Sequence, residues 1–402
     1  MMFNSILCRY HEIATKGNNR IMFERCLVDN IHCLFKKAGF DYPVRRVRGR
    51  VWIEKKDGTL FDAEELKNIS QVLQRTFGIE SFSPAIKLAS DMDVLEAKVK
   101  ELAPVVFEEF FQKYNNVTFR VRARRSNKAF PLCSKDIEIR LADALTSVVD
   151  EDRLTVNLDE AMVTFGCEVR DEFALLFLNE TKGPGGLPVG SNEGAVALFS
   201  GGIDSPVACY MTMKRGCPVD FVAFHSNPYT PQETTDKIKR IAAHMNLFQR
   251  GGKLFLCNLV EFQKRVRDYC TPKYRTILYR RGMLRIAEKI AGKYHRIALL
   301  TGDSVGQVAS QTLQNMRTID AATPMLVLRP LVGMDKMETI RIAEKIGTFE
   351  LSNVQVPDSC TVFSPSQAAT TSDIATIEAE EALIPDYDAV LSTIAEEAEV
   401  LR

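Results

Sequence analysis

Residues 195–207, AVALFSGGIDSPV, are the stretch that decides the fold. Five apolar residues open it, as expected of a buried parallel strand. Two glycines then permit a tight turn with outward-facing backbone N–H groups, and Asp204 or Ser205 can cap a helix that has Pro206 in its first turn. Unpaired N–H groups and the helix dipole both favour an anion at such a junction. The stretch therefore predicts a phosphate-binding loop in an α/β fold.

The glycine pair alone is weak evidence, because ordinary turns also use Gly-Gly. No lysine follows the glycines, so the loop does not match the Walker pattern. The complete SGGIDS at 200–205, between a strand and a helix, is far more specific. It resembles the PP-loop of ATP pyrophosphatases, which adenylate a substrate and release pyrophosphate.

Length and composition describe a globular chain. The 402 residues predict two to four domains, and 46% hydrophobic residues suffice for real cores. No apolar run approaches the roughly 18 residues of a membrane span. The first ten residues lack the charged and apolar regions of a signal peptide. We therefore expect a cytoplasmic protein that does not enter a membrane.

Charge is uneven along the chain although the formal net charge is zero. Residues 1–50 hold ten Lys or Arg and four Asp or Glu, a net charge of +6. Residues 371–402 hold nine acidic residues and one Arg, a net charge of −8. This distribution favours a polyanion partner at the N-terminal end, the alternative being charged surface without a partner.

Ten cysteines and five histidines are scattered without a C-x-x-C pair or ligand spacing. A zinc or iron–sulfur site is therefore disfavoured, and we expect no metal bound by the protein alone. Most cysteines should be reduced core residues.

The first 88 residues predict a β-α-β-β-α-β order, the ferredoxin-like arrangement. The expected strands are 5–9, 44–48, 51–54 and 81–88, and the expected helices are 18–37 and 62–76.

The next segment, to residue 182, predicts a second small α/β unit. A helix at 91–114, interrupted near Pro104, precedes the strand FRVRARR at 119–125. Its alternation places Arg120, Arg122 and Arg124 on one face. A solvated antiparallel strand can look like this, but three repelling arginines favour an anion. A helix at 136–149 and short strands near Val156, Val169 and Leu175 complete the unit. The predicted RNA-binding residues are Lys16, Arg20, Arg120, Arg122, Arg124, Arg125 and Lys128.

A linker at 182–194, with GPGGLP at 183–188, precedes a domain of alternating strands and helices. Residues 230–233, TPQE, match a capping box, and the acidic tail predicts one or two helices around Pro385. The alternation predicts a doubly wound parallel sheet with its ligand at the carboxyl ends of the strands. The other expected strands are 219–225, 254–258, 296–300 and 325–328, and the other expected helices are 273–293 and 335–346.

Three loops should meet at that edge: 200–205, 224–227 and 301–311. A nucleotide there would place its phosphates on the glycine turn. Gly302 would let backbone approach the base, and Gln311 would reach base or ribose. Arg280 and Arg281 would neutralise phosphate, unless they only form a solvated helix face.

Cys360 lies in a polar, loop-like stretch, VPDSCT at 356–361. Most cysteines are inert core residues, and Cys209 is expected to be one. A cysteine in a polar loop of the nucleotide-binding domain is instead a candidate nucleophile or sulfur carrier.

These residues together resemble the tRNA 4-thiouridine synthetase family, also called ThiI, in the form without a rhodanese domain. The resemblance covers nearly the whole length. It rests on the PP-loop and on RYHEIATKGNNR at 9–20, TFGI at 76–79, GPGGLPVG at 183–190, TGDSVGQVASQTL at 301–313 and LRPL at 328–331.

The resemblance implies an N-terminal ferredoxin-like domain at 1–79, a THUMP domain that binds tRNA at 80–182, and a PP-loop domain at 183–402. The family's catalytic cysteine falls on Cys360. With Ser200, Gly201, Gly202, Asp204 and Ser205 of the loop, the implied ATP contacts are Leu198, Phe199, Ala223, Phe224, Arg280, Gly302 and Gln311.

The implied reaction adenylates O4 of the uridine at position eight of tRNA, with ATP and Mg²⁺, and releases pyrophosphate. Persulfide sulfur from a cysteine desulfurase then displaces AMP at C4. Some members also serve thiazole synthesis with a sulfur-carrier protein. The chemistry of the residues agrees, since the loop can stabilise departing pyrophosphate and Asp204 can take part in catalysis by holding Mg²⁺.

Several points stay open at the level of sequence. Too few residues follow the PP-loop domain for a rhodanese domain, so the resolving thiol is either another cysteine, such as Cys270, or on a separate protein. Homodimer formation is undetermined. The competing functions are another adenylating PP-loop ligase and a non-catalytic RNA-binding protein.

Overall fold

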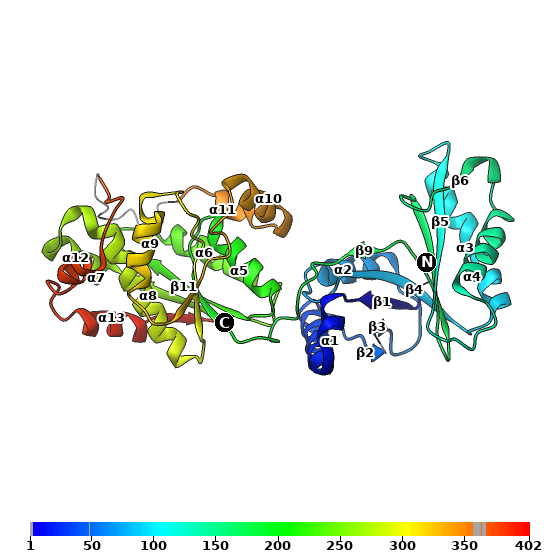
Figure 1. The fold of residues 1–402 in the computed structure, drawn as a ribbon, viewed down its shortest axis with the longest axis horizontal. Helices are drawn as coiled ribbons and strands as arrows, with labels where there is room; N and C mark the ends of the chain where they lie inside the picture. The colour runs from blue at the N-terminus through cyan, green and yellow to red at the C-terminus, as the bar shows by residue number, and fades with distance from the viewer. Residues whose placement is uncertain (1–2, 48, 357–362, 364–366) are drawn as a thin grey trace. The chain divides into compact units, whose positions relative to one another are not determined.

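The computed structural model describes residues 3–47, 49–356, 363 and 367–402, and Cys360 lies outside this part. The chain forms two compact units, Met1–Gly185 and Gly186–Arg402 (Figure 1). The finer domain boundaries, after residues 79 and 182, stay predictions.

The first unit is built on a nine-stranded sheet in the order β2-β3-β1-β4-β8-β7-β5-β6, with β9 paired to β4. Its N-terminal half has the predicted β-α-β-β-α-β order, with antiparallel pairs β1–β3, β1–β4 and β2–β3. The elements of this half are β1 (Ser5–Arg9), η1 (Glu12–Thr15), η2 (Gly17–Asn19), α1 (Arg20–Lys37), β2 (Val44–Val47), β3 (Arg50–Glu54), α2 (Ala63–Leu73) and β4 (Ser81–Leu88).

The second half of this unit decides two points of the sequence analysis. Strand β5 runs parallel to both β6 and β7, so the alternative of a solvated antiparallel strand is wrong. The predicted interruption of the helix near Pro104 is also wrong. Helix α3 continues through Pro104, because buried Val99 and Phe107 on either side of the proline anchor it in the core. The elements are α3 (Met92–Phe111), β5 (Val117–Arg125), α4 (Ser134–Thr146), η3 (Glu151–Arg153), β6 (Leu154–Val156), β7 (Val163–Val169), β8 (Ala174–Leu178) and β9 (Thr181–Lys182).

The second unit contains the predicted doubly wound sheet, in the order β14-β13-β10-β11-β12-β15. Its first five strands are parallel, and helices cover both faces (Figure 1). The chain moves from β10 outward to β12 and then returns to β13 on the other side of β10. This reversal opens a crevice at the carboxyl ends of β10 and β13, the usual ligand position in such sheets.

The strands of this unit are β10 (Ala195–Leu198), β11 (Val219–His225), β12 (Leu254–Asn258), β13 (Ala298–Leu300), β14 (Leu326–Leu328) and β15 (Glu399–Leu401). The helices are α5 (Asp204–Lys214), α6 (Gln232–Met245), α7 (Val260–Tyr269), η4 (Pro272–Tyr274), α8 (Arg275–Lys293), η5 (Ala309–Gln311), α9 (Leu313–Asp320), α10 (Lys336–Ile346), α11 (Phe349–Asn353), α12 (Ile374–Glu381) and α13 (Tyr387–Glu396). Among the described residues, no helix is long and apolar enough to cross a membrane.

Helix ends follow local signals only where tertiary contacts allow. Asp335 caps α10 and Gly347, with φ of 77°, ends it, as the sequence indicates. The predicted capping box at 230–233 is wrong: Pro231 precedes α6 without a side-chain cap. The hydroxyl of Thr230 instead accepts a hydrogen bond from the Ser226 backbone N–H at 3.1 Å. The Thr230 hydroxyl therefore stabilises the turn after β11 and does not cap α6.

The acidic tail folds against α8 through a buried ion pair. Arg281 is fully buried, and its Nε lies 2.7 Å from Oε1 of Glu381 in α12. Arg281 also donates to the Thr318 carbonyl, while Arg285 and Tyr387 contact the same carboxylate at 3.0 and 2.9 Å. The prediction that Arg281 neutralises phosphate is therefore wrong, since its charge is committed to the tail.

We predict that Glu381→Gln destabilises the second unit by about 3–5 kcal/mol, because it leaves buried Arg281 without its counter-charge. Burial alone would raise the pKa of Glu381, but Arg281 and Arg285 outweigh it and lower the pKa. The ionised pair therefore stabilises the fold above the ordinary glutamate pKa and loses this effect as pH falls through the lowered value. Urea unfolding at neutral and acidic pH should show the deficit of the variant shrinking in acid.

Glu378→Gln is the matched control. Glu378 lies in the same helix, 3.8 Å from Arg281, but its side chain is 54% exposed. Such a partner contributes about 1 kcal/mol or less. Equal losses of unfolding free energy in Glu381→Gln and Glu378→Gln would contradict the prediction that Glu381 is the main counter-charge of Arg281.

Candidate active site

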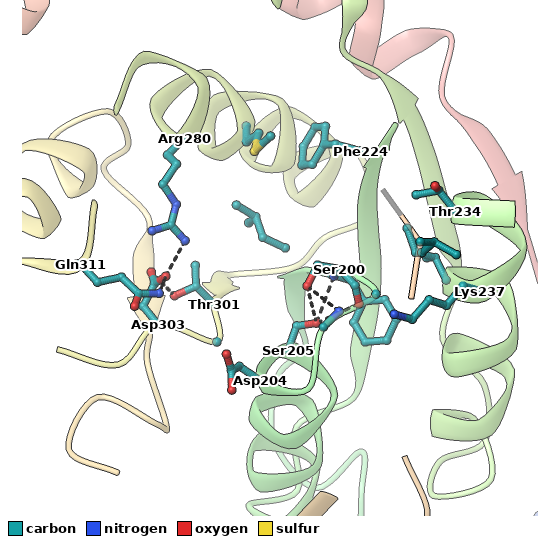
Figure 2. Close-up of a pocket in the computed structure, with 18 residues that line it drawn as sticks. Ser200, Asp204, Ser205, Phe224, Thr234, Lys237, Arg280, Thr301, Asp303 and Gln311 are labelled. Carbon is teal, nitrogen blue, oxygen red and sulfur yellow. Dashed lines mark hydrogen bonds and ion pairs between the residues drawn. The ribbon is translucent and has the colours of Figure 1, made fainter. Parts of the chain in front are cut away.

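The loop between β10 and α5 is closed by its two serines. Ser205 lies in the first turn of α5, and its hydroxyl accepts a hydrogen bond from the Ser200 backbone N–H at 3.0 Å (Figure 2). The residue before the helix, Ile203, provides no side-chain cap, so the predicted cap at Asp204 or Ser205 is wrong. The Ser205 hydroxyl is instead used to fold the glycine turn back onto the helix start.

This loop borders a cavity of about 340 Å³ at the carboxyl edge of the sheet (Figure 2). Of the predicted ATP-binding residues, Ala223 is fully buried in β11 and is not part of the lining. Of the 224–227 loop, only Phe224 contributes. The predicted residues that line the cavity are Leu198, Phe199, Ser200, Gly201, Gly202, Asp204, Ser205, Phe224, Arg280, Gly302 and Gln311.

The lining also includes Thr301 and Asp303 of the predicted 301–311 loop, which were not named as contacts. Residues that the sequence prediction missed altogether are Thr234, Lys237, Ile238, Met283 and Val356. Val356 lies four residues before Cys360 in the sequence. The described chain therefore reaches the cavity just ahead of the candidate sulfur carrier.

Several hydrogen-bond donors surround Asp303 on the side of the cavity opposite the loop (Figure 2). It accepts hydrogen bonds from Arg280, from Thr301 Oγ1 at 2.8 Å and from Gln311 Nε2 at 3.0 Å, and Arg329 Nε lies 3.4 Å away. Burial alone would raise the pKa of Asp303, but the Arg280 charge and these hydrogen bonds outweigh it and lower the pKa. The charge of Arg280 is thus already paired within the protein.

Asp204 lines the cavity, and both of its carboxylate oxygens accept hydrogen bonds. Lys336 Nζ lies 2.7 Å from Oδ1, and Gln307 Nε2 donates to Oδ2 at 3.1 Å. A single carboxylate beside a phosphate cradle fits Mg²⁺, which often binds one protein carboxylate together with phosphate oxygens and water. Lys336 was not predicted, although its position at the start of a helix after β14 places it at the same sheet edge.

Lys237 links the loop to the segment that precedes Cys360. Its Nζ donates to the carbonyls of Ser352 at 2.7 Å and Val354 at 2.8 Å. A Cβ added at Gly201 would lie 3.2 Å from Cδ of Lys237. The glycine therefore leaves room for the lysine stem beside the loop.

Gly302 is required by packing between two loops. A Cβ there would lie 2.8 Å from the Ser205 backbone nitrogen and 2.9 Å from the Asp204 carbonyl carbon. The segment after β13 can therefore approach the start of α5 only without a side chain. The sequence analysis explained Gly302 by a close approach of backbone to the base. The contact with α5 is a second reason why position 302 requires glycine.

The described cysteines of this unit do not resemble reactive thiols. Cys209 is fully buried in α5, and burial raises the pKa of its thiol, as expected for a packing residue. Burial, with Glu380 and Glu381 nearby, raises the pKa of Cys270 to about 12. Cys270 is also only 7% exposed, and its thiol donates to the Glu380 carbonyl at 3.4 Å, so it is poorly placed for a resolving role.

Strand β5 of the first unit presents its arginines as predicted. Phe119, Val121 and Ala123 are buried, and the alternate face opens on a cavity of about 780 Å³. Arg120, Arg122 and Arg124 line this cavity together with Arg9 and Lys182.

The remaining predicted RNA-binding residues are partly engaged within the protein. Arg20 Nε lies 2.8 Å from Glu24, and Lys16 lies 3.6 Å from Glu12. Arg125 donates to the carbonyls of Phe130 and Leu132 and so fixes the turn that contains Lys128. Arg122 donates to the Leu158 carbonyl at 2.7 Å and Arg120 to the same oxygen at 2.9 Å, which holds the β6–β7 turn beside the cavity.

A phosphate cradle at the reversal point of a doubly wound sheet defines a nucleotide-binding α/β enzyme, here joined to a unit with an arginine-lined cavity. Family models agree with this class. They match residues 5–83 as a ThiI ferredoxin-like domain, 89–179 as a THUMP domain and 190–384 as a thiamine biosynthesis protein (ThiI).

Full-length relatives share this organisation. Probable tRNA sulfurtransferases of Halothermothrix orenii and Lachnoclostridium phytofermentans are 36% and 37% identical, each over 100% of this chain and 99% of the relative. A crystal structure of a 4-thiouridine synthetase–RNA complex with bound ATP matches with a TM-score of 0.87 and 34% identity, covering 99% of both chains. PH1313 of Pyrococcus horikoshii, 22% identical with a TM-score of 0.65 over 86% of this chain and 99% of its own, shares the fold. The chain belongs to the ThiI family of tRNA sulfurtransferases.

We predict that Gly302→Ala weakens ATP binding by about 10-fold or more, because overpacking of about 1–3 kcal/mol must separate the two loops. Titration calorimetry measures the affinity, and thermal melting reports whether the fold survives. Gly333→Ala is the control, since no heavy atom lies within 4 Å of a Cβ added at Gly333. Unchanged ATP affinity in Gly302→Ala would contradict the packing argument.

Proposed function

We propose that the protein is an ATP-dependent tRNA sulfurtransferase that converts the uridine at position eight to 4-thiouridine. The observation that carries this proposal is the phosphate cradle of 200–205, in a chain alignable over 99% of its length with a 4-thiouridine synthetase bound to RNA and ATP. The ferredoxin-like and THUMP models over the first unit support tRNA as the substrate.

The first step activates the uridine. Its O4 is a poor leaving group, and attack of O4 on the α-phosphate of ATP converts it into a good one. Backbone N–H groups of the loop and the start of α5 stabilise the negative charge of departing pyrophosphate. Leu198, Phe224 and Met283 provide an apolar wall that suits a base.

Asp204 and Lys336 are placed to balance the charges of a bound metal ion and of the ATP phosphates. Asp204 would hold Mg²⁺, which supplies electrostatic stabilisation to the phosphates when bound. Lys336 is 44% exposed and pairs with Asp204, so its ammonium group can move to a phosphate oxygen when the carboxylate accepts another cation. The pair thus keeps the cavity close to neutral near Asp204 before ATP binds.

Cys360 carries the sulfur in this proposal. A cysteine desulfurase would supply it as a persulfide on Cys360. The outer sulfur of the persulfide then attacks C4 and displaces AMP, which leaves the new sulfur joined to Cys360 by an S–S bond. A second, resolving thiol attacks the Cys360 sulfur, forms a disulfide with it and releases 4-thiouridine. Support comes from Val356, which lines the cavity, and from the Lys237 hydrogen bonds to Ser352 and Val354. Because Cys270 is a poor resolving thiol, a thiol on a separate protein suits this role better.

The wider setting of the reaction follows from its substrates. The proposed location of the protein is the cytoplasm, where tRNA is modified. A sulfur-carrier protein of thiazole synthesis would be a second acceptor of sulfur from it. A homodimer is compatible with the proposal.

We predict that Cys360→Ala binds ATP and tRNA with unchanged affinity but forms no 4-thiouridine, because the sulfur-carrying thiol is lost. Nucleoside analysis of tRNA from a strain that lacks the gene and carries the variant measures the product. Cys133→Ala, a change of an exposed cysteine in the first unit, is the control and should restore the product. Thiolation by Cys360→Ala would refute the role of Cys360.

We predict that Arg124→Ala weakens tRNA binding at every sequence tested and reduces the slope of log affinity against log salt by about 1, as expected for one phosphate contact. Arg140→Ala removes the same charge from α4, where Arg140 pairs with Glu96 at 2.6 Å, and should leave the slope unchanged. Equal slopes for Arg124→Ala and the unaltered protein would exclude the β5 face as the RNA surface.

A further inference from the structure

Phe363, three residues after Cys360 in the sequence, is held between two side chains of the second unit. Its ring centroid lies 5.1 Å from that of Tyr229, and the two ring planes meet at 67° in an edge-to-face arrangement. The guanidinium carbon of Arg267 lies 5.0 Å from the Phe363 centroid. Both the aromatic pair and the cation above the ring are attractive arrangements. The chain after Cys360 is therefore attached to the second unit at Phe363.

The two side chains that hold Phe363 belong to one connected support. Tyr229 lies in the turn after β11, where its backbone N–H donates to the Ser226 carbonyl at 2.6 Å. Ser226 is fully buried, and its hydroxyl donates to the Gln263 side chain of α7 at 2.7 Å. Gln263 lies four residues before Arg267 in the same helix, so the two share a face. The turn and the helix are thus joined, and Tyr229 and Arg267 keep a fixed relation to each other.

The backbone of Phe363 indicates that these contacts hold the residue against a conformational cost. Its φ is 62°, in the left-handed region that a phenylalanine rarely adopts. Such a conformation persists only where the surrounding contacts keep the residue in place. Arg267 is itself oriented by Asp268, which accepts hydrogen bonds from its Nε at 2.7 Å and its Nη2 at 3.1 Å. The ring of Phe363 therefore meets a cation whose position is already set.

The chain before Cys360 is attached to the second unit as well. Lys237 Nζ donates to the Val354 carbonyl at 2.8 Å, and Val356 lines the cavity. Cys360 thus lies between two described points of attachment, Val354 and Phe363, nine residues apart. In the proposed reaction the outer sulfur of the Cys360 persulfide must reach C4 of the adenylated uridine. Attachment at both ends restricts the thiol to fewer positions and so raises its effective concentration at the cavity.

We propose that Tyr229 and Arg267 are positioning residues, which hold Phe363 so that the Cys360 persulfide is presented to the adenylated uridine. This role rests on the proposed function in taking Cys360 as the sulfur carrier. Neither side chain belongs to the described lining of the ATP cavity, so the effect of changing them should appear in sulfur transfer and not in adenylation.

The test separates the two steps in a single turnover of the full chain, loaded with sulfur by a cysteine desulfurase and mixed with ATP, Mg²⁺ and tRNA. Pyrophosphate release reports adenylation, and 4-thiouridine in the tRNA reports sulfur transfer, normalised to the persulfide content found by mass spectrometry. Tyr229→Ala should release pyrophosphate at the unaltered rate but form 4-thiouridine about 10-fold more slowly, because the aromatic pair is lost. Tyr229→Phe keeps the ring and should transfer sulfur normally. Tyr269→Ala, which removes another exposed tyrosine from α7, is the control and should also transfer sulfur normally.

The size of the effect distinguishes fixed presentation of the sulfur from a simple tether. Beyond Phe363, the Ala369 N–H donates to the Lys273 carbonyl at 2.9 Å. Without the Phe363 contacts, the chain between Val354 and the next described attachment grows from nine residues to fifteen. For a flexible tether this change lowers the effective concentration only about 2-fold.

Arg267→Gln tests the same role from the other side of the ring. It removes the cation but keeps the Tyr229 contact, and should slow sulfur transfer about 3-fold with pyrophosphate release unchanged. This variant keeps the test available if Tyr229→Ala does not fold, which thermal melting would show.

A loss of about 2-fold or less in Tyr229→Ala, or an unchanged rate in Arg267→Gln, would overturn the role of the residue that was changed. A loss that follows weaker tRNA binding, measured as the Kd of each variant, would also overturn it, because the Tyr229 ring would then contact RNA. Failure of the tRNA thiolation proposal would be seen instead as absence of 4-thiouridine with the unaltered protein, so the two failures are distinguishable.

Discussion

The candidate site depends on the close contact between Gly302 and the first turn of α5. The start of this helix is where phosphate is expected to bind, and the segment after β13 holds Asp303 and Gln311. A side chain at position 302 would separate these two segments, because its Cβ would meet the backbone of Asp204 and Ser205. Two strands that are neighbours in the sheet but about a hundred residues apart in sequence thus supply opposite walls of one cavity. The wall that cradles phosphate and the wall that orients Gln311 are fixed by the same contact.

Cations around this cavity are largely neutralised by the protein itself. Arg280 pairs with Asp303, Arg281 with Glu381, and Lys336 with Asp204. Phosphate binding must therefore rely first on backbone N–H groups and the dipole of α5, whose strength does not depend on a side-chain charge. Lys336 differs from the two arginines because it is 44% exposed and its partner, Asp204, is suited to a metal ion. The two arginine pairs are therefore fixed parts of the structure. The Lys336–Asp204 pair can instead rearrange when a triphosphate enters the cavity.

The sequence predicted those parts of the fold that depend on local pattern. Strands β11 and β12 have the predicted limits and contain the apolar runs 221–224 and 254–257, and Asp335 and Gly347 bound α10 as their capping chemistry requires. Long-range contacts explain the failures. Thr230 bonds to Ser226 instead of capping α6, and β15 forms only because β12 offers a free edge to the tail. Within the site, the glycine loop was recognisable from its spacing. Lys237, Asp303 and Lys336 were not, because their roles arise from partners brought together by the fold, up to 132 residues away in the case of Lys336 and Asp204.

In the proposed reaction, adenylation takes place on O4 and sulfur then attacks C4, the carbon that carries this oxygen, so both steps act on one carbonyl group. A single cavity meets this requirement if the sulfur carrier can reach the adenylated base without a large movement of substrate. The described chain supports such an arrangement from one side: Val356 lines the cavity, and Lys237 holds the carbonyls of Ser352 and Val354 while its stem passes beside Gly201. Lys237 therefore contacts both the phosphate loop and the segment leading to Cys360. The proposed delivery of sulfur from Cys360 to a uridine adenylated at the loop requires these two segments at a fixed separation, and this lysine supplies a direct physical connection between them.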